Sequence, residues 1–311
     1  MNIKTVKIQK MAALSPMASV ADTAYRTICK QFGASYTVSE MVSVKGLFYN
    51  FGQSSLLCNI TEVERPMAIQ LFGAEPEFFE KAAKSIEIFS PDIIDINMGC
   101  PVKKVVGTGA GAALMKNIPL ASDIVKAVIS ASNSPVTVKF RSGYDEVNAE
   151  KFADAMEKAG ADAMCIHPRL RREMYSGKSD WNIIKAIKKN SSVPIIGSGD
   201  VKTLEDCLEM YEKTGCDLVS IGRGSYGNPF LFAKIKAYFD KTPYTPPSSQ
   251  TILNTMVSHI KMISNIKEAR KVAAWYIKDM RNAAYFRRKC YEINSHTDAE
   301  NLAEEILSNL N

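Results

Sequence analysis

The sequence predicts an α/β fold: a (β/α)₈ TIM barrel followed by a small C-terminal helical domain. Eight short apolar runs, rich in β-branched residues, alternate with amphipathic segments of helical period. This alternation is typical of parallel strands joined by βαβ connections. Eight strands over roughly 240 residues favour a closed barrel over an open doubly wound sheet. After the eighth unit the alternation stops, and a helical pattern runs to the end of the chain.

The elements can be placed in chain order. Strands are predicted at residues 11–14, 36–39, 67–71, 93–97, 136–139, 163–167, 195–197 and 218–221. Helices are predicted at residues 77–89, 120–131, 149–159 and 204–214. After each of the last two helices, a glycine is followed two residues later by an aspartate that precedes a strand (Gly160 and Asp162, Gly215 and Asp217). Because glycine suits the C-cap of a helix, these phrases indicate the rear turns of successive βα units.

A linker is predicted between the two parts of the chain. Residues 242–249 read TPYTPPSS, and three prolines in this segment exclude a regular helix or strand. We therefore expect a barrel domain at residues 1–242, a linker at 243–249 and a helical domain at 250–311.

Composition excludes several classes of protein. The chain has 311 residues, of which 46% are hydrophobic, enough for one large core and a small second domain. Its net charge of +6 permits a polyanionic partner but does not require one. The N-terminus has no apolar signal-peptide core and no apolar run is long enough to span a membrane, so we expect a cytoplasmic protein. The seven cysteines form no CxxC pair, which argues against a metal site or disulfide framework.

Polar residues and glycines follow the predicted strands at their C-terminal ends, where the active sites of such barrels form. A barrel with only a structural role has no reason to collect Lys, His, Cys, Arg and Asn at one rim. The residues concerned are Ser15, Pro16, Met17, Ala18, Gln70, Asn97, Gly99, Cys100, Pro101, Lys139, Arg141, His167, Ser198, Gly199, Asp200, Gly222, Arg223 and Gly224.

Three side chains at this rim have alternative interpretations. Cys100 alone would be a small core residue, but Gly99 and Pro101 set a sharp exposed turn around it, which favours a functional thiol. Lys139 lies in an apolar strand, where a buried ammonium group needs a partner. His167 fits a hydrogen-bonded core histidine and a site residue equally well.

The glycine turns after the seventh and eighth strands indicate a phosphate site, because their N–H groups can face an anion without a side chain in the way. Residues 222–227, GRGSYG, also match the GxGxxG pattern of dinucleotide-binding folds. That pattern here follows the last strand, no βαβ unit comes after it, and Asn228 and Pro229 interrupt the expected helix. We therefore interpret it as part of the barrel's phosphate site.

These motifs resemble the tRNA-dihydrouridine synthases, most of all the bacterial B type, over nearly the whole chain. The Asn97-Met98-Gly99-Cys100-Pro101 signature is the most specific part of the resemblance. The other matching segments, in chain order, are residues 16–18, 70–73, 102–105, 109–114, 138–139, 175–177, 180–181, 221–224 and 270–281. Two departures stand out: Ser198 replaces a usual Asn, and residues 168–171 read PRLR where the family has GRTR.

The resemblance implies noncovalent FMN, NADPH or NADH as electron donor, and transfer RNA or ribosomal RNA as the partner that carries the uridine. It implies flavin contacts from Pro16, Met17, Ala18, Gln70, Lys139 and His167, phosphate contacts from Ser198, Gly199, Asp200, Gly222 and Arg223, and uracil contacts from Asn97 and Arg141. Nothing in the sequence indicates a membrane or an obligate protein partner.

The residues suit the reduction of uracil. Its C5=C6 bond is conjugated to the C4 carbonyl, so a hydride can add at C6 and a proton must then be added at C5. Cys100 is the candidate proton donor, because a thiol with a pKa of about 8.5 is mostly protonated at neutral pH. Lys139 can stabilise negative charge on reduced flavin. The base must leave its stack to reach a barrel mouth.

Positive charge is concentrated near the C-terminus. Residues 261–289 contain nine Lys or Arg and two acidic residues, a charge of +7 against +6 for the whole chain, with aromatic residues between them. This segment fits an RNA-contacting surface, although a solvated helix face that packs through its aromatic residues is the alternative. The expected RNA contacts are Arg281, Arg287 and Arg288 there, and Arg169, Arg171 and Arg172 in the rim loop after His167.

Two other functions remain open from the sequence. One is an FMN-dependent dehydrogenase of free pyrimidines, such as a dihydroorotate dehydrogenase, for which the basic helical domain would be superfluous. The other is an RNA-binding protein without catalysis, for which Cys100 and Lys139 would have no purpose. No separate nicotinamide motif is present, and the position of the modified uridine is not set by the sequence.

Overall fold

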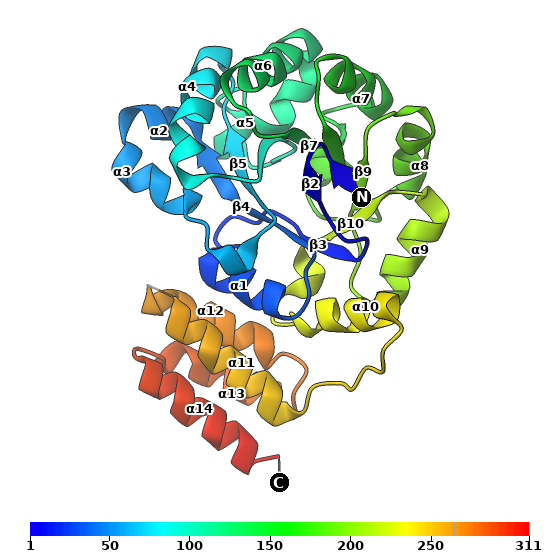
Figure 1. The fold of residues 1–311 in the computed structure, drawn as a ribbon. Coiled ribbons are helices and arrows are strands. Elements are labelled where there is room, and N and C mark those ends of the chain that lie inside the picture. The colour runs from blue at the N-terminus through cyan, green and yellow to red at the C-terminus, as the bar shows by residue number, and fades with distance from the viewer. Residues whose placement is uncertain (264, 311) are drawn as a thin grey trace.

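The computed structural model describes residues 1–263 and 265–310. Its main body is a closed barrel of eight parallel strands in the order β10-β3-β4-β5-β6-β7-β8-β9 (Figure 1). The strands are β3 (Ala12–Leu14), β4 (Tyr36–Ser43), β5 (Met67–Phe72), β6 (Ile93–Met98), β7 (Val136–Gly143), β8 (Ala163–Leu170), β9 (Ile195–Ser198) and β10 (Leu218–Ile221). Each coincides with a predicted strand, and the predicted barrel is confirmed.

Three strands extend further than the sequence pattern indicates. β4, β7 and β8 continue by three or more residues beyond the predicted ends, to Ser43, Gly143 and Leu170. The pairing register shifts near these ends, between Val38 and Met41 and between Arg141 and Gly143. Each extension mixes polar residues with apolar ones such as Val42 and Phe140, so the apolar run of the strand is interrupted there.

Helices surround the barrel in sequence order, as Figure 1 shows. They are α1 (Thr23–Gln31), α2 (Val44–Tyr49), α3 (Phe51–Ser54), α4 (Pro76–Ile86), α5 (Lys103–Val106), α6 (Ile118–Ala131), α7 (Ala149–Lys158), α8 (Trp181–Asn190), α9 (Leu204–Thr214) and α10 (Phe230–Asp240). The four predicted helices correspond to α4 with the 3₁₀ turn after it, α6, α7 and α9. The segment after β4, which holds α2 and α3, was not predicted.

The rear turns use one repeated device. Gly215 ends α9 in the left-handed conformation, with φ of 69°, as the sequence predicts. Asp217 then accepts a hydrogen bond from the N–H of Ile195, the first residue of β9, at 2.8 Å. Asp162 binds the N–H of Val136 in the same way, also at 2.8 Å. Each aspartate therefore satisfies the first N–H of the preceding strand and fixes the register between neighbours.

The N-terminal end of the barrel is closed by a hairpin. β1 (Asn2–Ile3) and β2 (Val6–Lys7) pair antiparallel. Ile3 and Ile8 are buried in one cluster with residues that line the inside of the barrel, among them Tyr36 and Cys165. Because this end is filled with apolar side chains, the interior is accessible from the C-terminal ends of the strands.

The C-terminal region consists of α11 (Ser249–Met262), α12 (Ile266–Tyr276), α13 (Ala283–Lys289) and α14 (His296–Ser308). Residues 242–248, before α11, form no regular element. The four helices share a hydrophobic cluster, which Ala24 of α1 and Phe230 of α10 join, and Figure 1 shows them beside these two helices. Ser264 and Asn311, which fall within the predicted helical domain, lie outside the described residues. None of the described helices is long and apolar enough to cross a lipid bilayer.

Candidate active site

A cavity of about 350 Å³ opens at the C-terminal ends of the barrel strands. All residues that the sequence predicts to contact flavin or uracil line it, together with Cys100. The lining residues of the prediction are Pro16, Met17, Ala18, Gln70, Asn97, Cys100, Lys139, Arg141, His167, Ser198, Gly199, Asp200, Gly222 and Arg223. The strands therefore bring together side chains that lie more than 200 positions apart in the sequence.

The turn that carries Cys100 is held from two sides. Asn97, at the end of β6, accepts hydrogen bonds through Oδ1 from the N–H groups of Gly99 (3.1 Å) and Cys100 (2.9 Å). Across the turn, the Cys100 carbonyl accepts a hydrogen bond from Ala112, and a Cβ at Gly111 would lie 2.7 Å from that carbonyl oxygen. Gly111 also has a φ of 60°, so glycine is needed where the two segments meet.

The Cys100 thiol differs from the other six cysteines, which are all buried, in being partly exposed. Burial raises the pKa of the Cys100 thiol, although the N–H of Val102 and the positive charges of Arg141 and Lys139 act in the opposite direction. The thiol is therefore protonated at neutral pH and can donate a proton into the cavity.

A polar layer crosses the barrel below Cys100. The carboxylate of Asp95 accepts hydrogen bonds from Gln70 Nε2 and Thr137 Oγ1, both at 2.6 Å. Burial raises the pKa of Asp95 to about 6, against these hydrogen bonds and the charge of Lys139. Gln70 Oε1 in turn accepts a hydrogen bond from Asn97 Nδ2 at 2.9 Å. Because both ends of the Asn97 amide are engaged, its evident role is to orient the Cys100 turn. The predicted uracil contact would need the second Nδ2 hydrogen, which lies toward Met41 Sδ at 3.9 Å.

Lys139 and His167 lie on adjacent strands and face the same cavity. Within the described residues, the Lys139 ammonium forms no ion pair or hydrogen bond, so the partner that a half-buried lysine requires is not a protein group there. His167 Nε2 lies 3.0 Å from Arg169 Nη1 and must accept the bond, because arginine only donates. Burial and the nearby positive charges lower the pKa of His167 well below its usual value. The ring is thus neutral, with its proton on Nδ1.

Arg141 joins the cavity to the Cys100 turn. Its Nε donates to the Gly99 carbonyl at 2.8 Å and its Nη1 to the Met174 carbonyl at 2.8 Å. Within the described part of the chain Nη2 has no protein acceptor, and it remains free for an oxygen of a substrate. Tyr175, which is 47% exposed, lies at the mouth between two guanidinium groups. The centroid of its ring is 5.5 Å from Cζ of Arg141 and 4.6 Å from Cζ of Arg223.

The two glycine turns form the opposite wall. Gly199 has a φ of 116°, and a Cβ there would lie 2.4 Å from Ser179 Oγ and 2.9 Å from His167 Cδ2, so no other residue fits. Among the described residues, the N–H groups of Gly199, Asp200 and Gly222 have no protein acceptor. Free N–H groups beside Arg223 are suited to a phosphate group.

Arg169 differs from the prediction that it contacts RNA. Its side chain is 1% exposed, and its Nη2 binds both carboxylate oxygens of Asp200 at 2.7 Å. Although burial alone would raise the pKa of Asp200, the hydrogen bonds from Arg169 and Ser179 hold it below its usual value. Arg169 therefore holds the glycine turn from below, and its side chain is buried rather than exposed at the surface. The sequence could not show this, because its partners come from the turn after β9 and from the loop after η5 (Arg171–Glu173).

The remaining predicted RNA contacts lie nearer the surface. Arg281, Arg287 and Arg288 are exposed, as is Arg172, whereas Arg171 is half-buried. The aromatic residues among them divide: Tyr276 and Phe286 are buried in the helical core, and Tyr285 is exposed. The alternative interpretation, that the aromatic residues of this segment pack into the protein, thus holds for Tyr276 and Phe286.

Sequence reasoning missed two aromatic residues of the cavity, Tyr175 and Tyr226. Tyr175 lay within residues 175–177, a segment that carried the resemblance, and that was the available signal. Tyr226 lay within the GxGxxG match. The glycines of that match serve contacts between loops: a Cβ at Gly224 would lie 2.2 Å from the Val201 carbonyl oxygen, and one at Gly227 would lie 2.3 Å from the backbone of Trp275.

With this geometry in view, comparison with known proteins identifies the family. The sequence model of the family described as "Dihydrouridine synthase (Dus)" matches residues 13–311. The chain belongs to the dihydrouridine synthase family. This membership confirms the resemblance that the motifs indicated, and with it the predicted enzyme class, an oxidoreductase that forms dihydrouridine.

Curated dihydrouridine synthases are similar over most or all of their length. A probable tRNA-dihydrouridine synthase of Rickettsia bellii is 36% identical, in an alignment that covers 92% of this chain and 91% of that protein. The tRNA-dihydrouridine synthase B of Shewanella oneidensis is 33% identical, with 100% and 99% covered. That of Pseudomonas aeruginosa is 34% identical, with 92% and 89% covered.

Solved structures show the same fold at lower identity. Histamine dehydrogenase from Rhizobium sp. 4-9 superposes with a TM-score of 0.62 at 13% identity, covering 84% of this chain, which spans 50% of the dehydrogenase chain. A variant of NCR from Zymomonas mobilis superposes with a TM-score of 0.54 at 17% identity, covering 79% of this chain and 91% of that one. At these identities the likeness is one of fold.

Proposed function

We propose that this dihydrouridine synthase is a cytoplasmic enzyme that reduces the C5=C6 bond of uridine in transfer RNA, with noncovalent FMN and with NADPH as electron donor. The observation that carries the proposal is the cavity itself, which places a protonated, partly exposed Cys100 opposite a free ammonium group and a wall of free N–H groups. The names of the relatives in Rickettsia, Shewanella and Pseudomonas support transfer RNA as the substrate.

The residues present fit FMN. The free N–H groups of Gly199, Asp200 and Gly222 are suited to its phosphate, and Arg223 supplies positive charge beside them. Ser198, which replaces the usual Asn, is buried at the end of β9, and the proposed phosphate contacts beside it use backbone N–H groups that do not depend on this side chain. Pro16, Met17, Ala18 and Gln70 would line the ring, with Lys139 and His167 near the ring or the ribityl chain. A half-buried ammonium group without a protein partner matches a ligand that carries negative charge when reduced.

When bound, FMN supplies the hydride that adds to C6 of the uracil. The chain's own residues do the rest. The Cys100 thiol donates a proton to C5, so the C5=C6 bond becomes a single bond. Arg141 Nη2 can hold a uracil oxygen while its Nε fixes the Gly99 carbonyl of the Cys100 turn. Tyr175 offers a ring face at the mouth, where a base that has left its stack can lie.

The division of labour between the two parts of the chain also belongs to the proposal. Residues 1–242 would bind FMN and carry the reaction, and residues 250–311 would bind RNA through Arg281, Arg287 and Arg288. The rim residues Arg171 and Arg172 would add contacts beside the cavity, whereas Arg169 would act on the flavin site. Residues 242–248, which form no regular element, fit the linker.

The experiment is to release the flavin from purified protein, identify it, and then treat tRNA that lacks dihydrouridine with the protein and NADPH. Mass spectrometry of the digested tRNA should show dihydrouridine, and the released flavin should be FMN. Free uridine, orotate and ribosomal RNA serve as competing substrates. Reduction of a free pyrimidine in preference to tRNA, release of FAD, or absence of any flavin after reconstitution would each overturn the proposal.

A further inference from the structure

The loop between β3 and α1 lines the cavity and has an unusual backbone. Pro16, Met17 and Ala18 belong to the cavity wall. Ser19, which follows them, has a φ of 58°, a left-handed conformation that residues other than glycine adopt only where their surroundings hold them. Ala21 closes the turn by donating its N–H to the Met17 carbonyl at 2.9 Å.

Three charged side chains hold this loop through its backbone. Glu40 of β4 accepts a hydrogen bond from the Ser19 N–H. Lys271 of α12 donates to the Ser19 carbonyl at 2.8 Å. Arg26 of α1 donates through Nη1 to the Ala21 carbonyl at 2.7 Å. Both polar groups of the Ser19 backbone are therefore bound, one by the barrel and one by the C-terminal helices.

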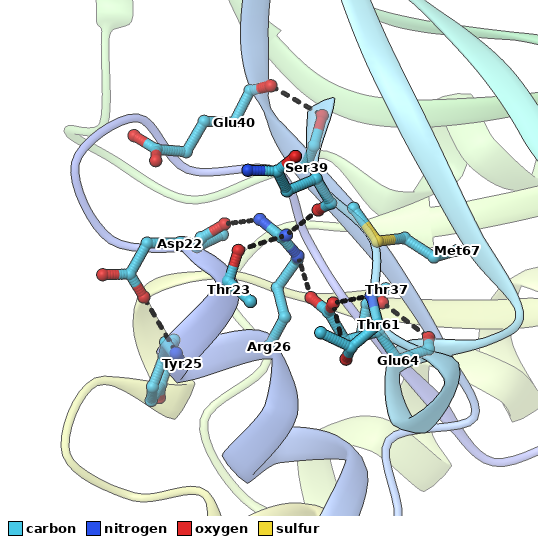
Figure 2. A network of polar contacts seen from close by, with 12 residues as sticks. Asp22, Thr23, Tyr25, Arg26, Thr37, Ser39, Glu40, Thr61, Glu64 and Met67 are labelled. Atoms are coloured by element: carbon cyan, nitrogen blue, oxygen red, sulfur yellow. Dashed lines mark hydrogen bonds and ion pairs between the residues drawn. The ribbon is translucent and has the colours of Figure 1, made fainter. Parts of the chain in front are cut away.

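The barrel side of this arrangement is a fixed anchor, which Figure 2 shows. Arg26 Nε lies 2.6 Å from Glu64 Oε1, and the two side chains are 2% and 0% exposed. Glu64 Oε2 accepts two more hydrogen bonds, from the N–H and the hydroxyl of Thr61. A buried ion pair whose atoms are all engaged cannot shift without leaving a charge unpaired, so it ties the loop firmly to α1 and to the segment before β5.

The contact from the C-terminal helices is more exposed than this buried ion pair. Lys271 is 37% exposed and also pairs with Glu268 of the same helix. A second cavity, of about 360 Å³, separates the outer face of the loop from α11 and α12, and Ser19, Glu40 and Lys271 line it. The Lys271 ammonium thus lies at this cavity and supplies the hydrogen bond that joins the Ser19 carbonyl to the C-terminal helices.

The same helix touches a second loop of the flavin cavity. The ring of Trp275 in α12 stacks on Tyr226 with 4.9 Å between centroids, and Lys278, just after the end of α12, donates to the Tyr226 carbonyl at 3.1 Å. Tyr226 lines the first cavity. Helix α12 therefore supports two walls of the site, although the sequence presents it only as part of a basic surface.

From these contacts we infer that Lys271 is a positioning residue of the flavin site, which acts from the C-terminal helices by holding Ser19 and, through it, the segment that contains Met17 and Ala18. The inference rests on the proposed function, because it concerns the cavity assigned to FMN. It separates Lys271 from Arg281, Arg287 and Arg288, whose proposed role is to contact RNA.

The test compares Lys271→Met, which keeps the stem and removes the ammonium group, with Lys271→Arg and with Lys267→Met. Lys267 is an exposed lysine of the same helix, with no side-chain partner among the described residues. The rate of hydrogen–deuterium exchange in the peptide that spans residues 15–22 measures how readily the backbone of the loop opens. The dissociation constant of FMN measures the affinity of the cavity for flavin. It is determined without RNA, from the rise in flavin fluorescence as FMN dissociates.

Lys271→Met should speed exchange in the loop and weaken FMN binding by about fivefold, as expected for removing one half-exposed hydrogen bond. Lys271→Arg should keep the exchange rate and the FMN affinity of the wild type, and Lys267→Met should change neither. Unchanged exchange in Lys271→Met overturns the inference, and so does faster exchange with unchanged FMN binding. If the wild-type protein binds no FMN, the proposed function fails and the positioning role fails with it, whereas exchange in the loop still shows whether Lys271 holds Ser19.

Discussion

At the scale of single residues, environment rather than residue type separates Cys100 from the other cysteines. Cys165 lies inside the barrel, where burial raises the pKa of its thiol to about 11. Burial also raises the pKa of Cys100, yet this thiol lines the cavity beside Arg141 and Lys139. Both thiols stay protonated at neutral pH, but the turn held by Asn97 presents only the first of them to a substrate.

The first prediction concerns this thiol. Cys100→Ala should lower the rate of dihydrouridine formation by about 10² to 10⁴, the usual effect of removing a general acid, and should leave FMN content unchanged. Because the reaction needs the protonated thiol and its pKa is raised, wild-type activity should fall only at alkaline pH, above the usual range of a cysteine. Single-turnover assays of the reduced enzyme with tRNA, carried out at several pH values, measure the rate and its dependence on pH.

Cys165→Ala is the matched control, since it removes a buried thiol that lines neither of the two cavities. It should keep the wild-type rate per bound FMN. Dihydrouridine formation at a near-normal rate by Cys100→Ala would reject the assigned proton donor.

At the scale of elements, the contact between α1, α11 and α12 centres on a buried histidine. His259 of α11 is 1% exposed and stacks on Tyr25 of α1, with 5.2 Å between centroids. Its Nδ1 lies 3.2 Å from the Tyr276 hydroxyl of α12. Burial lowers the pKa of His259 from 6.5 to about 4, so the folded protein keeps this ring neutral where the unfolded chain would bind a proton.

The second prediction follows from the sign of that shift. A lowered folded-state pKa means that the stabilisation is complete above pH 6.5 and is lost as the pH falls toward 4. The loss attributable to His259 should reach about 3 kcal/mol, since one pKa unit corresponds to about 1.4 kcal/mol. In His259→Phe, the free energy of unfolding should therefore fall less steeply over this range.

Urea unfolding at several pH values gives the measurement, and the difference between variant and wild type removes the contribution of other groups, such as Asp95. His296→Phe, at an exposed position at the start of α14, should retain the wild-type slope. Identical slopes for His259→Phe and wild type would contradict the buried neutral histidine.

At the scale of the whole molecule, less of the positive charge near the C-terminus is free to bind a partner than the sequence indicates. Helix α14 brings Glu300 to Lys261 and Glu305 to Lys289, both at 2.5 Å. Lys271 and Lys278 point toward the barrel loops instead. In the described part of the chain, the cations of this segment without a protein partner are Lys267, Arg281, Arg287 and Arg288, and all four are exposed.

The third prediction uses the last three. Changing Arg281, Arg287 and Arg288 together to Ala should weaken tRNA binding and make its dependence on salt shallower, by about one unit of slope for each phosphate that the variant no longer neutralises. FMN content and NADPH oxidation without RNA should not change, because these side chains line neither cavity. Fluorescence titrations with labelled tRNA at several salt concentrations measure the effect.

The matched control changes Lys126, Lys151 and Lys189 to Ala, three exposed cations on the outer barrel helices α6, α7 and α8. It alters the net charge equally, so any loss of affinity that it shares is not specific to the helical surface. If the arginine variant binds tRNA with unchanged affinity and slope, the RNA contacts should be sought at Arg171 and Arg172.

The sequence by itself determined the barrel, its strands and the Cys100 turn, because periodicity, glycine caps and strand-to-turn transitions are local properties of the chain. Only the tertiary structure decided what the charged residues do. Arg169 is a basic residue in a rim loop, where an RNA contact is expected, but it is buried against Asp200. Lys271 lies in a basic segment, but it holds Ser19 of a distant loop. The physical reason is that the role of a charge depends on its partners and its exposure, and both are set by elements far away in the sequence.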